Sequence, residues 1–249
     1  MLHKACHLIR NIIPFAIYLL LVMVLPVNLM AQEGRISEDT VHSQALEGNL
    51  LDDSPNRSVY VYLPPGYDQG IQRYPVVYLL HGNGGRSNIW TQGRFQDLNI
   101  RVSMDSLINA GAIREMILVM PDANNRYRGS HYVNSSTTGN WADFITRDLI
   151  QYIDATYRTI PHANSRGLAG HSMGGRGTLY MAMTYPGIYG AIYGSSAGQM
   201  DFGELRQTPD NPDWWAKLIN LQDISQADRR MVRMLGLTAA FTPNPNRPP

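Results

Sequence analysis

The stretch that decides the fold is Gly170-His171-Ser172-Met173-Gly174-Gly175. It lies between a short apolar run and a helical pattern. The pattern Gly-x-Ser-x-Gly at a turn from a strand into a helix exposes a serine hydroxyl, and the glycines are needed because side chains would collide in so tight a turn. We therefore predict that Ser172 is a nucleophile.

Alternating or apolar runs on both sides of this motif predict strands at residues 58–63, 75–80, 116–120, 166–169 and 191–193. Apolar residues at helical spacing predict helices at 141–157, capped by Asn140, and at 175–185. This alternation predicts an α/β fold, a doubly wound and mostly parallel sheet with helices on both faces. Further helices rich in Trp and Met are expected at 213–219 and 227–237, as core rather than as a lid.

A glycine-rich loop, His81-Gly82-Asn83-Gly84-Gly85, follows the predicted strand at 75–80. Acyl transfer passes through a tetrahedral oxyanion, which main-chain N–H groups can stabilise. At this kind of turn one donor is the N–H group of the residue after the nucleophile, and the other is an N–H group in the loop after an earlier strand. We therefore assign the oxyanion hole to the N–H groups of Met173 and Asn83, and expect the His81 side chain to brace its loop.

The histidine that should activate the serine is not found, because no histidine follows His171. Enzymes with this motif supply serine, carboxylate and histidine in that order. Neighbouring strand side chains point to opposite faces, so His171 is expected to pack away from Ser172. His162 is expected to be solvated, and His131, in the loop after the strand at 116–120, is expected to be an exposed polar residue rather than a substrate contact. The aspartates after the serine close no predicted strand, so no triad acid is assigned among Asp201, Asp210, Asp213, Asp223 and Asp228.

Composition narrows the class of protein. The chain has 249 residues, 44% hydrophobic and 16% charged, with a net charge of +1. These values exclude a disordered chain and give no reason to expect a nucleic-acid partner. The only cysteine is Cys6, so neither a disulfide nor thiol catalysis is expected. No metal or organic cofactor is expected.

The N-terminus predicts export. Lys4 and Arg10 precede an uncharged apolar run at residues 12–25, and Ala31 offers a cleavage point. We interpret residues 1–31 as a signal peptide; the alternative is an uncleaved anchor at 12–30, which alone would give a membrane contact. Either reading carries the domain across a membrane, and we expect a secreted or periplasmic protein rather than one anchored by this segment. Residues 32–57 are expected to form a polar arm before a domain at 58–249.

The chain from Val59 to Pro249 resembles an esterase family of α/β-hydrolases that includes esterase D (S-formylglutathione hydrolase), feruloyl esterases, enterochelin esterases and the antigen 85 mycolyltransferases. The matching segments are residues 74–85 (Tyr-Pro-Val-Val-Tyr-Leu-Leu-His-Gly-Asn-Gly-Gly), 119–122 (Val-Met-Pro-Asp), 148–158 and 166–175. The resemblance implies Ser172 as nucleophile and Asn83 and Met173 as oxyanion donors. It also implies a later acid and histidine at the ends of two further strands.

Residues 239–246 resemble a segment that these relatives carry before their final portion. We therefore expect a fragment that lacks the last strands, rather than a complete pseudoenzyme. The expected function is a secreted serine carboxylic-ester hydrolase that forms an acyl-enzyme at Ser172, impaired in this chain. Its substrate would be a small-molecule ester or one linked to carbohydrate or lipid. The alternatives are an acyltransferase of the same fold and a non-catalytic secreted binding protein.

Overall fold

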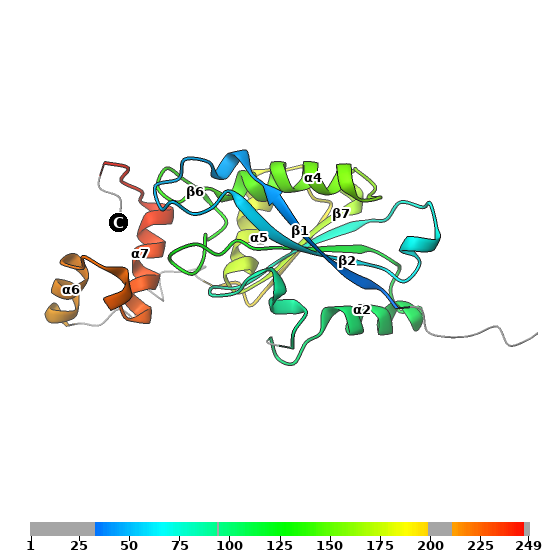
Figure 1. Cartoon of the computed structure of the whole chain (residues 1–249), viewed down its shortest axis with the longest axis horizontal. Helices are drawn as coiled ribbons and strands as arrows, with labels where there is room; N and C mark the ends of the chain where they lie inside the picture. Colours follow the sequence, from blue (N-terminus) through cyan, green and yellow to red (C-terminus); the bar gives the residue numbers. More distant parts are fainter. Residues whose placement is uncertain (1–32, 94, 199–210, 247–249) are drawn as a thin grey trace, which may run out of the picture. The chain divides into compact units, whose positions relative to one another are not determined.

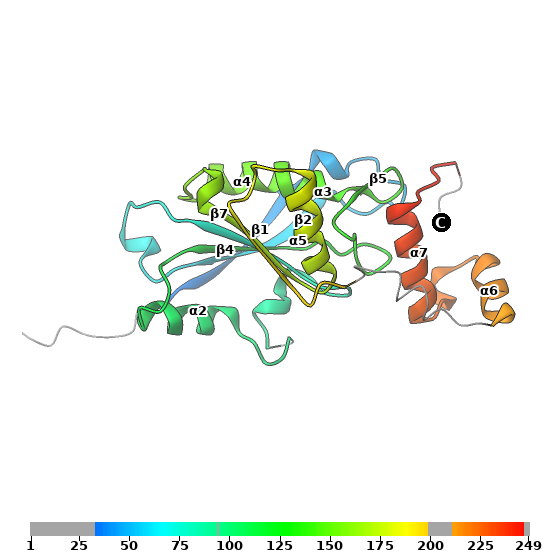
Figure 2. The same cartoon turned by 180° about the vertical axis from the view of Figure 1, so that it is seen from behind.

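The computed structural model describes residues 33–93, 95–198 and 211–246, which form a six-stranded sheet with helices on both faces (Figures 1 and 2). The strand order is β1-β2-β4-β3-β7-β8. The contacts β1–β2 and β2–β4 are antiparallel, and the contacts among β4, β3, β7 and β8 are parallel. The strands are β1 (Arg35–His42), β2 (Asn56–Leu63), β3 (Val76–Leu80), β4 (Ile117–Pro121), β7 (Arg166–His171) and β8 (Ala191–Ser195), with a separate hairpin of β5 (Asn134–Ser135) and β6 (Gly139–Asn140).

Helices α4 and α5 lie on one face of the sheet and α2 lies on the other (Figures 1 and 2). A π-helical turn at Phe144–Asp148 joins α3 to α4, so the chain is helical throughout this region. The helices are α2 (Ile100–Asn109), α3 (Trp141–Asp143), α4 (Leu149–Thr156), α5 (Met173–Thr184), α6 (Pro212–Ile219) and α7 (Arg229–Phe241), with 3₁₀ turns at Gln44–Leu46, Tyr67–Gln69, Ser87–Trp90, Ala163–Ser165 and Ile224–Gln226.

Strand β3 shows how the sequence supplies both layers of the core. Val76, Tyr78 and Leu80 pack in the cluster that also holds the buried residues of α3 and α4, whereas Val77 and Leu79 pack with α2. Successive side chains of a strand point to opposite faces, so an uninterrupted apolar run is what a strand covered on both sides requires. Each large apolar side chain buried in this way contributes roughly 1.5–3 kcal/mol.

All five predicted strands and both predicted helices beside the serine motif are present. Asn140 is the N-cap residue, as predicted, but its side chain makes no capping bond, and Asn134 Oδ1 instead accepts from the Asp143 N–H at 3.1 Å. The region read as a polar arm contains β1, which pairs with β2 along its whole length. Its edge position explains the polar sequence, because an edge strand of this kind is largely solvent-exposed.

The two C-terminal helices differ in their packing. Helix α7 buries Met231, Ala239 and Ala240, and the Ser135 hydroxyl donates to the Ala239 carbonyl at 2.6 Å. Figures 1 and 2 place α7 beside the β5–β6 hairpin. Helix α6 buries no residue, and its Trp215 is 36% exposed. The prediction that this Trp- and Met-rich segment is core therefore holds for α7 and is wrong for α6.

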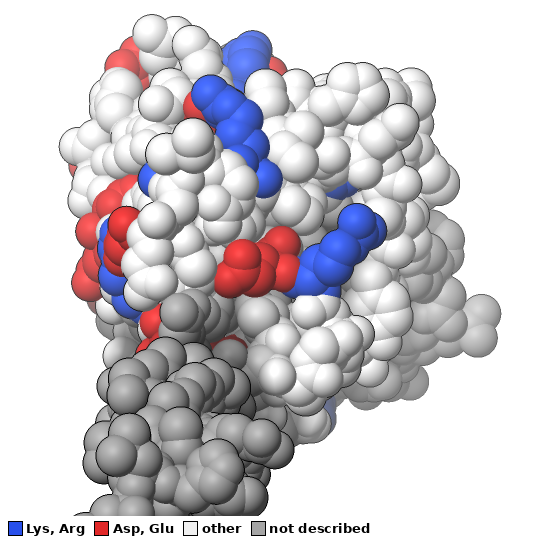
Figure 3. Space-filling view, turned by 90° about the vertical axis from the view of Figure 1, so that its right-hand side faces the viewer, with Lys and Arg blue, Asp and Glu red and all other residues white. Residues whose placement is uncertain are grey.

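Charge is mixed on the described surface. Figure 3 shows acidic and basic side chains lying next to one another among uncharged ones. Exposed pairs such as Arg35–Asp68, at 2.7 Å, contribute little to stability. No helix within residues 33–93, 95–198 and 211–246 is long and apolar enough to span a bilayer. The predicted signal peptide at 1–31 lies outside the described residues.

Candidate active site

The candidate site is built where the carboxyl ends of parallel strands meet. Leu80 at the end of β3 pairs with Gly170 near the end of β7. The loop that begins at His81 and the turn that contains Ser172 therefore start at the same level of the sheet. Ligands of open α/β sheets bind in crevices at this edge.

Ser172 forms the sharp turn between β7 and α5. Its φ is 54° and its ψ is −115°, a conformation that costs a non-glycine residue free energy. Three main-chain hydrogen bonds hold the turn: the Ser172 N–H donates to the Ser195 carbonyl, and the Ser172 carbonyl accepts from Arg176 and Gly198, each at 3.0 Å. This is the strained strand-to-helix geometry that presents a serine hydroxyl at the top of a sheet.

Gly174 lets the first turn of α5 approach β3. A Cβ on Gly174 would lie 2.7 Å from the Leu80 carbonyl carbon and 2.8 Å from the His81 carbonyl oxygen. Both are main-chain atoms, which cannot move aside without displacing the strand. The glycine in this position of the motif is therefore required by packing.

The loop after β3 runs directly past the serine. A Cβ on Gly82 would lie 3.3 Å from the Ser172 Cβ. A Cβ on Gly129, in the loop after β4, would lie 2.9 Å from Asn83 Nδ2 and 3.0 Å from Met173 Cε. The structure thus brings together Ser172, Asn83 and Met173, the three residues that the sequence assigned to the site.

His81 braces two loops, as the sequence predicted. Its ring is fully buried, its Nδ1 donates to the Gly82 carbonyl at 2.8 Å, and its Nε2 accepts from the Ala123 N–H at 2.9 Å. The Tyr132 hydroxyl donates to the His81 carbonyl at 2.9 Å. Burial lowers the pKa of His81, which agrees with a neutral ring whose proton is on Nδ1.

The other histidines near the motif have different surroundings. His171 packs edge-on against Phe95, with 4.7 Å between ring centroids, as expected for a side chain directed away from the serine. His162 is exposed, as predicted. His131 contradicts its prediction: it is only 1% exposed, because Phe241 of α7 packs against its ring at 5.7 Å. Within the described residues no histidine is hydrogen-bonded to the Ser172 hydroxyl.

Two of the aspartates that follow the serine, Asp223 and Asp228, cap helical turns. Asp213 lies in the first turn of α6, where its N–H donates to Asn211 Oδ1 at 2.9 Å. Asp223 Oδ1 accepts from the Ser225 N–H, and Asp228 Oδ1 accepts from the Met231 N–H, both at 2.8 Å. These main-chain hydrogen bonds lower the pKa of both carboxyl groups. Asp201 and Asp210 lie outside the described residues.

No signal in the sequence pointed to two arginines near the site, the buried Arg57 and the half-buried Arg176. Arg57 of β2 forms a buried ion pair with Asp122, 3.4 Å apart, and burial lowers its pKa. Arg176 of α5 donates to the His131 carbonyl at 2.8 Å and lies 4.3 Å from the centre of the Phe241 ring. Burial lowers the pKa of Arg176 to about 10. Asp122 lies in the segment 119–122 that carries the family resemblance, but no local pattern in the sequence predicts its role.

The fold and the serine turn define an α/β-hydrolase. A solved ferulic acid esterase is similar, with 28% identity and a TM-score of 0.57 over 66% of this chain and 60% of that one. The family described as "Putative esterase" matches residues 54–235, more than half of the chain, so the chain belongs to that esterase family.

Two curated relatives support the same assignment. An esterase of Mycobacterium tuberculosis is 35% identical over 152 residues, which cover 59% of this chain and 31% of the relative. An endo-1,4-beta-xylanase/feruloyl esterase of Xylanibacter ruminicola is 34% identical over 137 residues, which cover 52% of this chain and 18% of the relative. The chain thus spans less than a third of the length of either curated relative.

Proposed function

We propose that this protein hydrolyses carboxylic esters through an acyl-enzyme at Ser172. The observation that carries the proposal is the contact between the strained serine turn and the loop that bears Asn83, where a Cβ on Gly82 would lie 3.3 Å from the Ser172 Cβ. Nucleophile and oxyanion donors must lie this close to act on one carbonyl group. Membership of the esterase family supports the same chemistry.

In the proposed reaction the Ser172 Oγ attacks the ester carbonyl carbon, and the carbonyl π electrons move onto oxygen. The N–H groups of Asn83 and Met173 donate to that oxyanion. The intermediate collapses by breaking the bond to the alcohol oxygen, which takes a proton as it leaves. Water then attacks the acyl-enzyme and releases the acid and Ser172.

This reaction needs a base that accepts the proton of Ser172. His81 cannot serve, because its Nε2 lone pair already accepts from Ala123 and its Nδ1 donates to Gly82. His171 packs on Phe95. We assign neither the base nor its acidic partner to a described residue.

We test the proposal with esters of two kinds, p-nitrophenyl acetate and methyl ferulate. The second is included because the Xylanibacter relative and the solved structure are named as ferulic acid or feruloyl esterases. The protein is produced as its gene encodes it, with any residues that flank this sequence. We expect turnover by the wild type and a loss on the order of a million-fold in Ser172→Ala, the size seen when a catalytic serine is removed from a comparable triad.

The two alternatives give different results in the same assay. An acyltransferase would transfer most of the acyl group to an added alcohol rather than to water. A binding protein would turn over neither ester, and a wild type as inactive as Ser172→Ala would contradict the hydrolase proposal.

We also propose that the protein is exported. Lys4, Arg10, the apolar run at 12–25 and Ala31 support a cleaved signal. Mass spectrometry of the N-terminus of the native protein tests it. A mature chain that starts at Gln32 is expected, and an intact start at Met1 would favour the anchor.

A further inference from the structure

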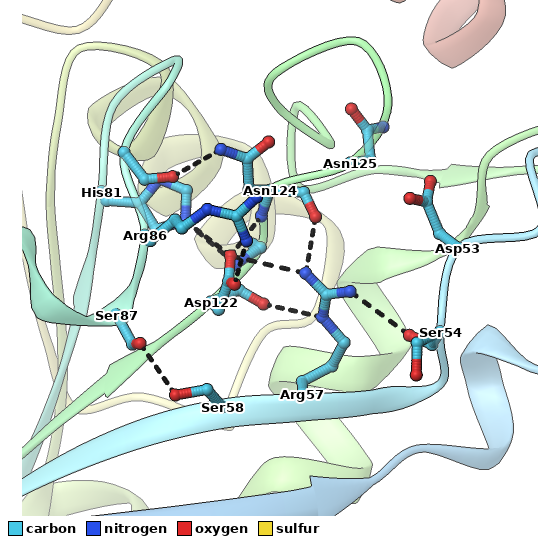
Figure 4. Close-up of polar contacts among 12 residues, drawn as sticks. Asp53, Ser54, Arg57, Ser58, His81, Arg86, Ser87, Asp122, Asn124 and Asn125 are labelled. Carbon is cyan, nitrogen blue, oxygen red and sulfur yellow. Dashed lines mark hydrogen bonds and ion pairs between the residues drawn. The ribbon is translucent and has the colours of Figure 1, made fainter.

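A buried polar network surrounds Asp122 at the end of β4 (Figure 4). Arg57 enters it from the start of β2, because the antiparallel pairing of β2 with β4 brings Val59 opposite Pro121. The Arg57 guanidinium donates to the main-chain carbonyls of Asp122 (Nε, 3.1 Å), Asn124 (2.6 Å) and Ser54 (3.3 Å). One arginine therefore fixes the main chain on both sides of Ala123.

The Arg57 guanidinium is itself held in place. It is only 7% exposed, and it lies 5.0 Å from the centre of the buried Trp141 ring. The planar group can stack on an aromatic ring while its edge makes several hydrogen bonds, which a lysine ammonium cannot do. The geometry of Arg57 thus requires an arginine.

The same network holds the oxyanion loop from both ends. At its start, His81 Nε2 accepts from the Ala123 N–H at 2.9 Å. At its end, the Asn124 amide donates to the Gly85 carbonyl at 2.8 Å and Arg86 pairs with the Asp122 carboxylate at 2.9 Å. Asn83 lies between these two anchors.

Other hydrogen bonds also hold this loop, since the Gly84 N–H donates to the Arg128 carbonyl at 2.6 Å and the Gly85 N–H donates to the Gly82 carbonyl at 3.0 Å. Three of the five residues from His81 to Gly85 are nevertheless glycines, and Gly84 has a φ of +78°. Glycine-rich segments populate many backbone conformations unless their surroundings select one. An oxyanion donor acts only when its N–H lies about 2.7–3.1 Å from the developing charge. The anchors therefore have a catalytic consequence as well as a structural one.

We propose that Arg57 is a positioning residue for ester hydrolysis: it fixes the Asp122–Asn124 segment, and that segment holds the loop whose Asn83 N–H binds the oxyanion. This inference rests on the proposed function. Arg57 does not touch the substrate, and its effect is transmitted through the Ala123–His81 and Asn124–Gly85 hydrogen bonds.

The test compares Arg57→Met with Arg166→Met. Arg166 is a matched control, since it is 9% exposed and pairs with Asp154 at 2.9 Å, but at the opposite end of β7 from Ser172. Both changes remove a buried arginine from a carboxylate. Only Arg57→Met should lower kcat, by about 10- to 100-fold at similar KM, the size expected when a catalytic group is misplaced by about 1 Å.

A second readout separates positioning from stability. A trifluoromethyl ketone adds to the serine and places an oxyanion in the hole, whereas the free acid product binds without one. In Arg57→Met the inhibition constant of the ketone should rise by the same factor as kcat/KM falls, and that of the product should stay constant. Arg57→Lys should recover only part of the loss. Equal losses in both methionine variants, or unchanged ketone binding in Arg57→Met, would overturn the inference.

Hydrogen–deuterium exchange of the peptide that covers residues 80–88 tests whether Arg57 holds this loop, and it does not depend on enzyme activity. We expect faster exchange in Arg57→Met and wild-type exchange in Arg166→Met. If the wild type turns over no ester, the hydrolase proposal fails. Faster exchange in Arg57→Met would in that case still support the role of Arg57 in holding this loop. Unchanged exchange would reject the positioning role, whatever the activity.

Discussion

Gly170 and Gly175 lie so close that a Cβ on Gly170 would come within 3.0 Å of the Gly175 main-chain nitrogen. The contact joins the end of β7 to the first turn of α5, on either side of Ser172. It shows why the serine turn tolerates no side chain at this position. The requirement belongs to the main chain and does not depend on which ester the protein uses.

Gly170→Ala should therefore be strongly destabilising, by about 3 kcal/mol or more, because main-chain atoms must shift. Gly167→Ala is the control in the same strand. Its Cβ would meet mainly the Val77 Cγ2, at 3.1 Å, which can move. Urea denaturation measures both changes in the free energy of unfolding, and equal values would contradict the packing argument.

The buried ring of His81 makes stability depend on pH. Its pKa is lowered by burial, so below about pH 6.5 the unfolded chain binds a proton that the folded chain excludes. The contribution of His81 to stability is therefore complete above that pH and is lost as the pH falls below it. In His81→Gln the amide can still accept from Ala123 but does not titrate.

Thermal unfolding between pH 8 and pH 5 checks this prediction. The melting temperature of the wild type should fall more steeply below about pH 6.5 than that of His81→Gln. The comparison removes the contribution of His42, whose raised pKa acts in the opposite direction and is common to both proteins. Parallel curves would show that His81 binds a proton as readily in the folded chain as in the unfolded chain, and would contradict the prediction.

Strand β8 forms an edge of the described sheet, with Tyr193 69% and Ile192 45% exposed. Apolar edge strands favour pairing between molecules, and a lysine on such a strand opposes it. We expect Tyr193→Lys to reduce light scattering of this chain at high protein concentration. Gln222→Lys, at an exposed position after α6, adds the same single positive charge and is the control for net charge alone. Equal scattering by Tyr193→Lys and the wild type would contradict the prediction.

The strands and the serine turn could be predicted because their signals are local. An apolar run such as residues 76–80, or the spacing of glycines around Ser172, depends only on neighbours in sequence. Strand β1 was not predicted because its sequence does not alternate: Ile36 and Val41 are five positions apart and pack in different core clusters, with polar and charged residues between them. Its place became clear only through pairing with β2.

The network around Asp122 could not be predicted for a different reason. Arg57 and Asp122 are 65 positions apart, and only the antiparallel β2–β4 contact brings them together. The burial of His131 depends in the same way on α7, more than 90 positions later, whose Phe241 packs on its ring. A loop residue is expected to be solvated until the segment that covers it is known.

The measurement that tests the central claim most directly is covalent labelling by a fluorophosphonate probe, read by intact mass and peptide mapping. An activated serine beside an oxyanion hole attacks such a probe, whereas an ordinary serine does not. We predict that the protein, produced with any residues that flank this sequence, takes up one probe molecule at Ser172 and that Ser172→Ala takes up none. A folded wild type that stays unlabelled, or a label on another residue, would contradict the assignment of Ser172 as the nucleophile.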